Sequence, residues 1–239
     1  MDHQILTDDD LISSMVEYNT SDRALSGFLC RPKGTEPLPA LLLIQEWWGL
    51  NDHIKEVAQR LAKEHYVVFA PDLYSRLGNV VTQNAAEAAK LSEAIPTDQL
   101  LSDLLGAVRY LKGLPHVNER KVGVIGFCVG GSYALSLACR TEEIRCAVPF
   151  YGEVPPDAEL EKLSAPLLYF YGEEDGWIQK EEVQRLKSTL KRCKKVAEIK
   201  TYPGTPHAFF NDTRREVYNP EAARDAWKRS LQFLKKYLK

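Results

Sequence analysis

The chain has 239 residues, of which 44% are hydrophobic and 27% are charged. These values are typical of a globular protein that is long enough to bury a large core without a metal or a disulfide. The net charge of −2 lacks the excess of Lys and Arg that proteins use to bind nucleic acid or an anionic membrane. We therefore expect neither nucleic acid nor a membrane as a partner.

Short apolar runs alternate with amphipathic segments from about residue 39 onward. The predicted strands are residues 40–45, 66–70, 122–126, 144–150, 166–170 and 196–202. Apolar side chains at helical spacing predict helices at residues 54–61, in the segment that ends at residue 112, at residues 129–139 and 179–192, and from residue 221. This alternation predicts an α/β fold with a mostly parallel central sheet and helices on both faces.

Residues 15–31 differ from the rest, because two short apolar segments flank the polar turn NTSD at residues 19–22. This pattern predicts an antiparallel hairpin at the N-terminal edge of the sheet. The chain contains no internal repeat and no long Pro, Gly or Ser linker. We therefore expect a single domain over residues 1–239.

The cellular location is predicted from the first residues and from the cysteines. The sequence starts with MDHQILTDDD, which is acidic and lacks the apolar run of a signal peptide. No stretch reaches the roughly 18 apolar residues of a membrane span. The five cysteines include no CxxC pair, which favours free thiols in a reducing compartment. We expect a cytoplasmic protein that is a monomer or a weak dimer.

The strongest motif is GFCVGG at residues 126–131, which follows a predicted strand and precedes a helix of small residues. This is the setting of the nucleophile elbow G-x-S-x-G, with Cys128 in place of serine. Glycines are needed there because a side chain two residues from the nucleophile would collide with the strand or the helix. The amino end of the helix also favours a thiolate.

A thiol nucleophile needs a base, and the base needs a group that orients it. The only histidine after Cys128 is His207, which lies in a Gly/Pro loop before the last predicted helix. The acid is expected in the loop after the strand at residues 166–170, where Asp175 is the best candidate and Glu173 and Glu174 are alternatives. The order nucleophile, acid, histidine is that of hydrolases with such an elbow.

These motifs, with QEWWGLN at residues 45–51, APDLY at 70–74 and HAFFN at 207–211, resemble the dienelactone hydrolase family of α/β-hydrolases over residues 15–238. The resemblance implies the α/β-hydrolase fold. It also implies a catalytic triad of Cys128, Asp175 and His207 that needs no metal or organic cofactor. The expected function is hydrolysis of a small-molecule ester or lactone through an acyl-enzyme. The alternative is a binding or regulatory protein that keeps the fold without catalysis.

The resemblance and the chemistry of the elbow imply further site residues. Glu46 would hold the resting thiol protonated, because a nearby carboxylate disfavours a second negative charge. The backbone N–H groups of Val129 and Trp47 are expected to form the oxyanion hole. Arg76 matches a family position that binds a substrate carboxylate, and Tyr151 matches a position near the pocket. The family's second arginine is replaced here by asparagine at residue 211.

Overall fold

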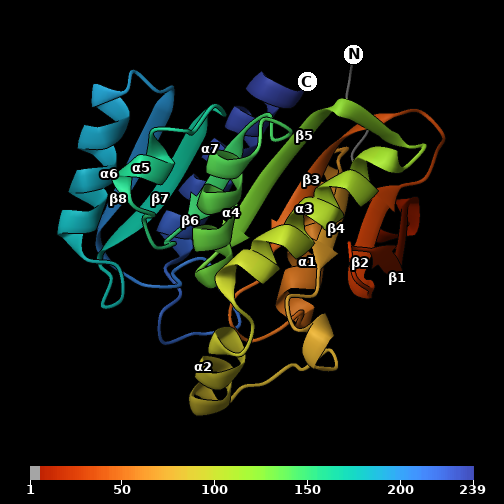
Figure 1. The fold of residues 1–239 in the computed structure, drawn as a ribbon, viewed down its shortest axis with the longest axis horizontal. Helices are drawn as coiled ribbons and strands as arrows, with labels where there is room; N and C mark the ends of the chain where they lie inside the picture. The colour runs from red at the N-terminus through yellow and green to blue at the C-terminus, as the bar shows by residue number, and fades with distance from the viewer. Residues whose placement is uncertain (1–5) are drawn as a thin grey trace. The chain divides into compact units, whose positions relative to one another are not determined.

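The computed structural model describes residues 6–239 and consists of two compact units, of which the first ends at Val122 and the second begins at Gly123. Each unit contains strands of the sheet and helices that pack on them (Figure 1). From the third strand onward the strands alternate with helices in both units, as the sequence predicts. The single domain over residues 1–239 stays a prediction.

The first unit contains four strands in the order β1-β2-β4-β3. Their bounds are Leu11–Asn19 (β1), Ala24–Pro32 (β2), Leu38–Ile44 (β3) and Val67–Pro71 (β4). β1 and β2 are antiparallel, with Leu11 opposite Pro32 and Asn19 opposite Ala24, whereas β3 and β4 are parallel. The predicted antiparallel hairpin at the sheet edge is therefore confirmed, and it extends beyond residues 15–31.

The helices of the first unit are α1 (Asp52–Lys63), α2 (Ala85–Glu93) and α3 (Thr97–Gly113), with short 3-10 turns at Asp8–Asp10 (η1) and Ser75–Leu77 (η2). α1 begins after Asn51, whose side chain accepts a hydrogen bond from the N–H of Ile54. α1 packs on β2 and β4, and α3 packs on β1, β3 and β4. Every residue of β4 is buried, as in a strand that is covered on both faces.

The helical segment that the sequence predicts up to residue 112 is divided into α2 and α3. Pro96 occupies the N-cap position of α3. A proline has no N–H to donate, and it disfavours helical backbone in the residue before it. α2 therefore ends at Glu93, and α3 begins at Thr97.

The strands of the second unit follow the order β5-β6-β7-β8, and neighbouring strands are parallel. The strands are Val117–Phe127 (β5), Ala147–Phe150 (β6), Leu167–Glu174 (β7) and Ala197–Pro206 (β8), and the helices are Val129–Arg140 (α4), Asp157–Leu160 (α5), Lys180–Arg192 (α6) and Pro220–Leu238 (α7). β5 begins before residue 122, within the first unit. The apolar pattern missed this start because residues 118–121 are polar.

Aromatic rings fill the core of the second unit near the carboxyl ends of its strands. The ring centroids of Phe127 and Phe210 are 5.0 Å apart and the rings are stacked. Those of Phe150 and Phe170 are 4.5 Å apart. Burial of these rings fixes the segment at residues 207–211 against β5 and β6.

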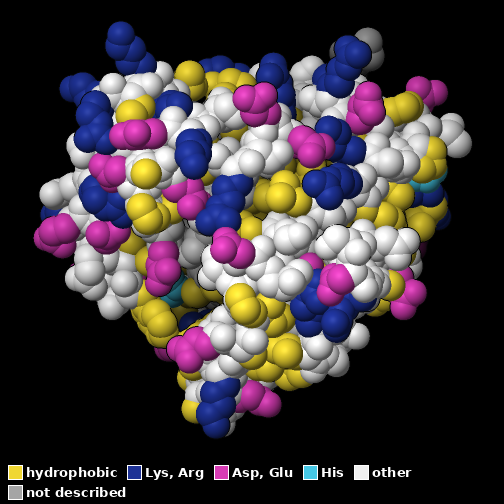
Figure 2. All heavy atoms as spheres, in the orientation of Figure 1, with side chains coloured by type: hydrophobic (Ala, Val, Ile, Leu, Met, Phe, Trp, Pro, Cys, Tyr) yellow, Lys and Arg dark blue, Asp and Glu magenta, His cyan; other side chains and the backbone are white. Residues whose placement is uncertain are grey.

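Charged side chains of both signs are mixed on the surface. On the face shown in Figure 2, Lys and Arg side chains lie among Asp and Glu side chains. Arg185 pairs with Asp157 at 2.8 Å, and Arg192 pairs with Glu161 at 3.1 Å. Over residues 6–239, the helices are too short or too polar for any of them to traverse a bilayer.

Candidate active site

Cys128 occupies the sharp turn between β5 and α4. Its backbone has φ 56° and ψ −122°, a conformation that residues other than glycine rarely adopt. Two hydrogen bonds hold it: the N–H of Cys128 donates to the carbonyl of Phe150 at 3.1 Å, and the N–H of Ser132 donates to the carbonyl of Cys128 at 3.1 Å. The turn therefore places the Cys128 side chain at the amino end of α4.

Two glycines allow this turn to form. A Cβ atom on Gly126 would lie 2.1 Å from the carbonyl oxygen of Gly130. A Cβ atom on Gly131 would lie 2.4 Å from the carbonyl oxygen of Phe150. Both distances are far below van der Waals contact, so only glycine lets α4 begin so close to β5 and β6. The expected collision of a side chain two residues from the nucleophile is confirmed at Gly126.

His207 and Asp175 form a direct hydrogen bond. The Nδ1–H of His207 donates to Oδ2 of Asp175 at 2.7 Å, since a carboxylate can only accept. The other oxygen, Oδ1, accepts from the N–H groups of Trp177 and Ile178 at 2.8 and 2.9 Å. The Asp175 side chain is fully buried. These bonds fix the carboxylate, which in turn fixes the orientation of the imidazole.

The structure also distinguishes among the three acids that the sequence offers for this position. Glu173 and Glu174 end β7, and both are exposed. Asp175 lies one residue further along the chain and is the acid that bonds to His207. The role of Asp175 as the acid of a catalytic triad stays a prediction.

The imidazole of His207 lies between Asp175 and Cys128. Its Nε2 atom is buried without a well-formed hydrogen bond to the described residues, and the Cys128 side chain interacts with the same ring. A loose contact between nucleophile and base is common before substrate binds. The rings of Tyr151 and Trp177 flank the imidazole, with centroids 4.9 and 6.0 Å away.

The surroundings of His207 change its pKa. Burial lowers the pKa, but the hydrogen bond to Asp175 and the interaction with Cys128 outweigh burial and raise it to about 10. A histidine pKa that is raised on folding stabilises the folded state fully below the unfolded value of about 6.5. This contribution is lost as the pH rises through about 10.

We expect the pKa of His207 to fall in both Asp175→Asn and Cys128→Ala, because each substitution removes a group that favours the imidazolium ion. An NMR titration of the imidazole protons measures this pKa directly. Urea unfolding of the wild type and of both variants shows whether each protein is folded. A His207 pKa that is the same in the wild type and in both variants would contradict the prediction.

Tyr151 follows β6 directly and is fully buried. Its N–H donates to the carbonyl of Phe170 at 2.8 Å, and its φ is 39°. The ring lies against His207 on one side and Phe209 on another, at centroid distances of 4.9 and 5.3 Å. The structure thus places Tyr151 beside the imidazole, and its contact with substrate stays a prediction.

Ser132 is a residue of this site that the sequence did not single out. Its hydroxyl accepts from the N–H of Glu153 at 2.8 Å and donates to the carbonyl of Cys128 at 3.4 Å. It therefore ties the turn at Cys128 to the loop that follows β6. No motif marks this residue, because a serine in a helix of small residues is typical of simple packing.

Glu46 and Trp47 lie in the first unit, two and three residues after the end of β3 at Ile44. Glu46 is buried, and the carbonyl of Trp47 accepts from the hydroxyl of Tyr74 at 2.8 Å. This bond holds the backbone of the segment whose N–H is expected to face an oxyanion. The roles of Glu46, Trp47 and Val129 stay predictions.

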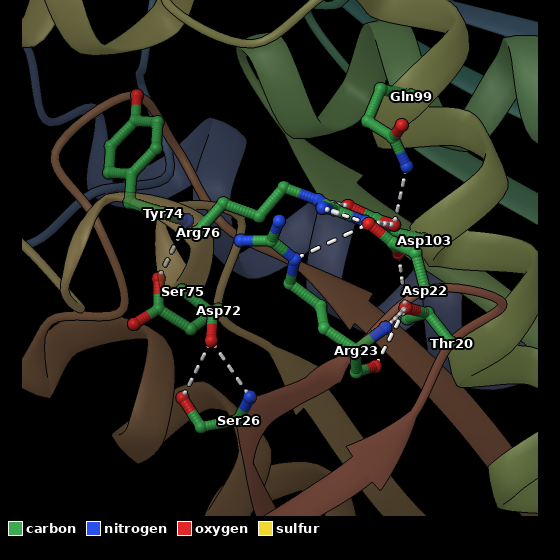
Figure 3. A network of polar contacts seen from close by, with 10 residues as sticks. All are labelled: Thr20, Asp22, Arg23, Ser26, Asp72, Tyr74, Ser75, Arg76, Gln99 and Asp103. Atoms are coloured by element: carbon green, nitrogen blue, oxygen red, sulfur yellow. Dashed lines mark hydrogen bonds and ion pairs between the residues drawn. The ribbon is translucent and has the colours of Figure 1, made fainter.

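Arg76 belongs to a network of polar side chains in the first unit (Figure 3). Its Nε and Nη2 atoms donate to the carboxylate of Asp103 at 2.6 and 2.7 Å. Its Nη1 and Nη2 atoms donate to the carboxylate of Asp22 at 2.9 and 2.7 Å. The sequence predicts that Arg76 binds a substrate carboxylate, whereas the structure gives its guanidinium two protein carboxylates as partners.

The fold and the sequence both match known proteins. The family model described as "Dienelactone hydrolase family" matches residues 25–238. A "Putative carboxymethylenebutenolidase" of Synechocystis sp. is 32% identical over 96% of this chain and 99% of its own length. A "Probable 2-oxo-3-(5-oxofuran-2-ylidene)propanoate lactonase" of Bradyrhizobium sp. is 33% identical over 93% of this chain and 94% of its own length. The solved structure of a "Putative Dienelactone Hydrolase from Klebsiella pneumoniae" has a TM-score of 0.88 at 27% identity, covering 95% of this chain and 99% of that one.

Proposed function

Because the chain belongs to the dienelactone hydrolase family, whose relatives carry carboxymethylenebutenolidase and lactonase names, we propose that it hydrolyses lactones or esters through a catalytic triad of Cys128, Asp175 and His207. One arrangement carries this proposal: the imidazole of His207 bonds to a buried carboxylate at 2.7 Å and interacts with the Cys128 side chain as well. This is the arrangement of nucleophile, base and orienting acid that acyl transfer requires.

The first half of the reaction forms a thioester. The sulfur of Cys128 attacks the carbonyl carbon of the substrate, and the thiol proton passes to Nε2 of His207. The hydrogen bond to Asp175 stabilises the protonated ring, so the proton stays there while the carbon–sulfur bond forms. The carbon–oxygen bond then breaks, the leaving alkoxide takes the proton from His207, and the acyl group remains on Cys128.

The second half of the reaction releases the acyl group. His207 takes a proton from a water molecule, whose oxygen attacks the thioester carbon. The tetrahedral intermediate collapses by breaking the carbon–sulfur bond, and the proton returns from His207 to the sulfur. The carboxylic acid leaves, and the enzyme is regenerated. Asp175 orients the ring and stabilises its charge in both halves.

Two further roles belong to the same proposal. The backbone N–H groups of Val129 and Trp47 stabilise the oxyanion of both tetrahedral intermediates. The carboxylate of Glu46 holds the thiol in its resting state until substrate binds. The bond from the Tyr74 hydroxyl to the Trp47 carbonyl supports the first of these roles, because it fixes the orientation of the Trp47 segment.

The acyl-enzyme predicts a constant partition ratio between two products. Esters with one acyl group and different alcohols all pass through the same thioester on Cys128. If hydroxylamine is added as a second nucleophile, we expect the same ratio of hydroxamate to acid from every ester, because the alcohol has left before the partition. The ratio is measured by chromatography after subtraction of the reaction without enzyme. A ratio that changes with the alcohol would show that no common acyl-enzyme is formed.

A further inference from the structure

Trp177 is an exposed aromatic residue next to the candidate triad, and the proposed reaction gives it no role. The residue is 63% exposed. Every other Phe, Trp and Tyr in residues 6–239 is buried or half-buried. Large aromatic rings are usually buried, because they contribute much of the apolar surface that folding removes from water. An indole that stays in contact with solvent at this place is therefore available to a ligand.

The loop around Trp177 is held on both sides of the exposed ring. The buried carboxylate of Asp175 accepts from the N–H groups of Trp177 and Ile178 at 2.8 and 2.9 Å. Ile178 is buried, and its carbonyl accepts from the hydroxyl of Tyr171 at 3.2 Å. A Cβ atom built on Gly176 would meet nothing within 4 Å, so the space beside this loop is open. The backbone is therefore fixed while the indole remains accessible.

The indole lies against the imidazole of His207. The two ring centroids are 6.0 Å apart, and the ring planes are tilted by 34°. A second ring against this imidazole belongs to Tyr151, which is fully buried. All three residues belong to the second unit, as Cys128 does. Of the two rings, Trp177 is thus the one that a molecule bound beside His207 can contact.

The proposed reaction places one part of the substrate beside this imidazole. His207 donates its Nε2 proton to the alkoxide that leaves, so the oxygen of the alcohol must lie within hydrogen-bond reach of Nε2. The other ring nitrogen, Nδ1, is already bonded to Asp175. The alcohol part of an ester therefore lies next to the ring on which Trp177 packs. An aromatic ring joined to that oxygen by one carbon atom can stack on the indole.

We propose that Trp177 is a substrate-binding residue that stacks on the alcohol part of the ester, so that the enzyme prefers aromatic alcohols to saturated alcohols of the same size. The inference rests on the proposed function, because it uses the proton transfer from His207 to the leaving oxygen. The alcohol leaves before water attacks the thioester on Cys128. Selection by Trp177 therefore acts on the release of the alcohol and not on the release of the acyl group.

A matched pair of substrates tests this inference. Benzyl acetate and cyclohexylmethyl acetate form the same acetyl thioester, and their alcohols differ only in whether the six-membered ring is aromatic. After division by the rate constants with hydroxide, we expect kcat/KM to be about three- to tenfold higher for benzyl acetate, as stacking of an aromatic pair contributes. Equal or lower values for benzyl acetate would overturn the inference. Failure to hydrolyse either ester would overturn the proposed function itself, and the inference with it.

Two variants assign the preference to the indole. Trp177→Leu removes the aromatic ring, whereas Trp177→Phe keeps one and serves as the matched control. We expect the ratio of the two kcat/KM values to fall to about one in Trp177→Leu and to stay above one in Trp177→Phe. Urea unfolding shows that each variant is folded. A ratio in Trp177→Leu that equals the wild-type ratio would overturn the inference, even if both values fall, because such a residue only supports the triad.

The acyl-enzyme gives a second readout that a structural role of Trp177 would change. With hydroxylamine present, the acetyl thioester partitions between hydroxamate and acid after the alcohol has left. We expect the same partition ratio in Trp177→Leu as in the wild type. A changed ratio would show that Trp177 acts on His207 or on the acyl-enzyme, and would overturn its assignment to the alcohol part.

Discussion

Substitution of Cys128 by alanine is expected to lower kcat/KM for ester hydrolysis by roughly ten-thousand-fold or more, as loss of a nucleophile does in other triads. No other thiol can take its place, since the interaction of His207 with a sulfur is with Cys128. The fold is expected to remain, because alanine keeps a Cβ atom and adds no volume to the turn. Initial rates with p-nitrophenyl acetate and urea unfolding curves measure the two quantities separately.

Cys193 offers a matched control for this substitution. It is partly exposed, as Cys128 is, and it follows α6 at a distance along the chain from the elbow. We expect Cys193→Ala to hydrolyse the same ester at the wild-type rate. Turnover by Cys128→Ala at the rate of the Cys193→Ala control would remove Cys128 from the mechanism.

The elbow could be predicted because its constraints are local. The strand, the tight turn and the helix are adjacent in sequence, and Gly126 stands where any Cβ atom would meet the carbonyl oxygen of Gly130. His207 could also be chosen as the candidate base from the sequence, because it is the only histidine after Cys128. Parallel strands bring their carboxyl ends to one edge of the sheet, so residues that follow strands can be expected to gather there.

The choice among Glu173, Glu174 and Asp175 was harder, because all three are acids in one loop. The sequence favoured Asp175 on the basis of the glycine that follows it. The structure supplies the physical reason: Oδ1 of Asp175 accepts two backbone N–H groups from the turn that follows, which a short side chain can reach. The glutamates belong to the end of β7 and are exposed to solvent.

The partners of Arg76 could not be predicted from sequence. Asp22 and Asp103 lie 54 and 27 residues away along the chain. Neither is marked by a motif, since the chain has 33 acidic residues that could pair with an arginine. A motif identifies the type of side chain at a position, but it does not show which charges the fold brings to that side chain. The sequence therefore could not show that the charge of Arg76 is paired with Asp22 and Asp103.

Substitution of Gly126 by alanine is expected to destabilise the protein by about 3 kcal/mol or more, the upper range for overpacking at a rigid site. The new Cβ atom would lie 2.1 Å from the carbonyl oxygen of Gly130 and 3.1 Å from the Cβ atom of Ala134. The first obstacle is backbone, so it cannot turn away as a flexible side chain would. Relief requires α4 to move away from β5, and such a movement also displaces Cys128 from His207.

Gly113 makes the comparison quantitative, because it allows the same chemical change without the collision. It is the last residue of α3, and a Cβ atom built on it meets nothing within 4 Å. We expect Gly113→Ala to be neutral or to stabilise the protein by about 0.5–1 kcal/mol, since alanine restricts the unfolded chain. Urea unfolding of both variants yields the two free energies. If Gly126→Ala unfolds at the same urea concentration as Gly113→Ala, then the elbow adapts to a side chain, and the close approach of α4 to β5 is not what fixes the nucleophile.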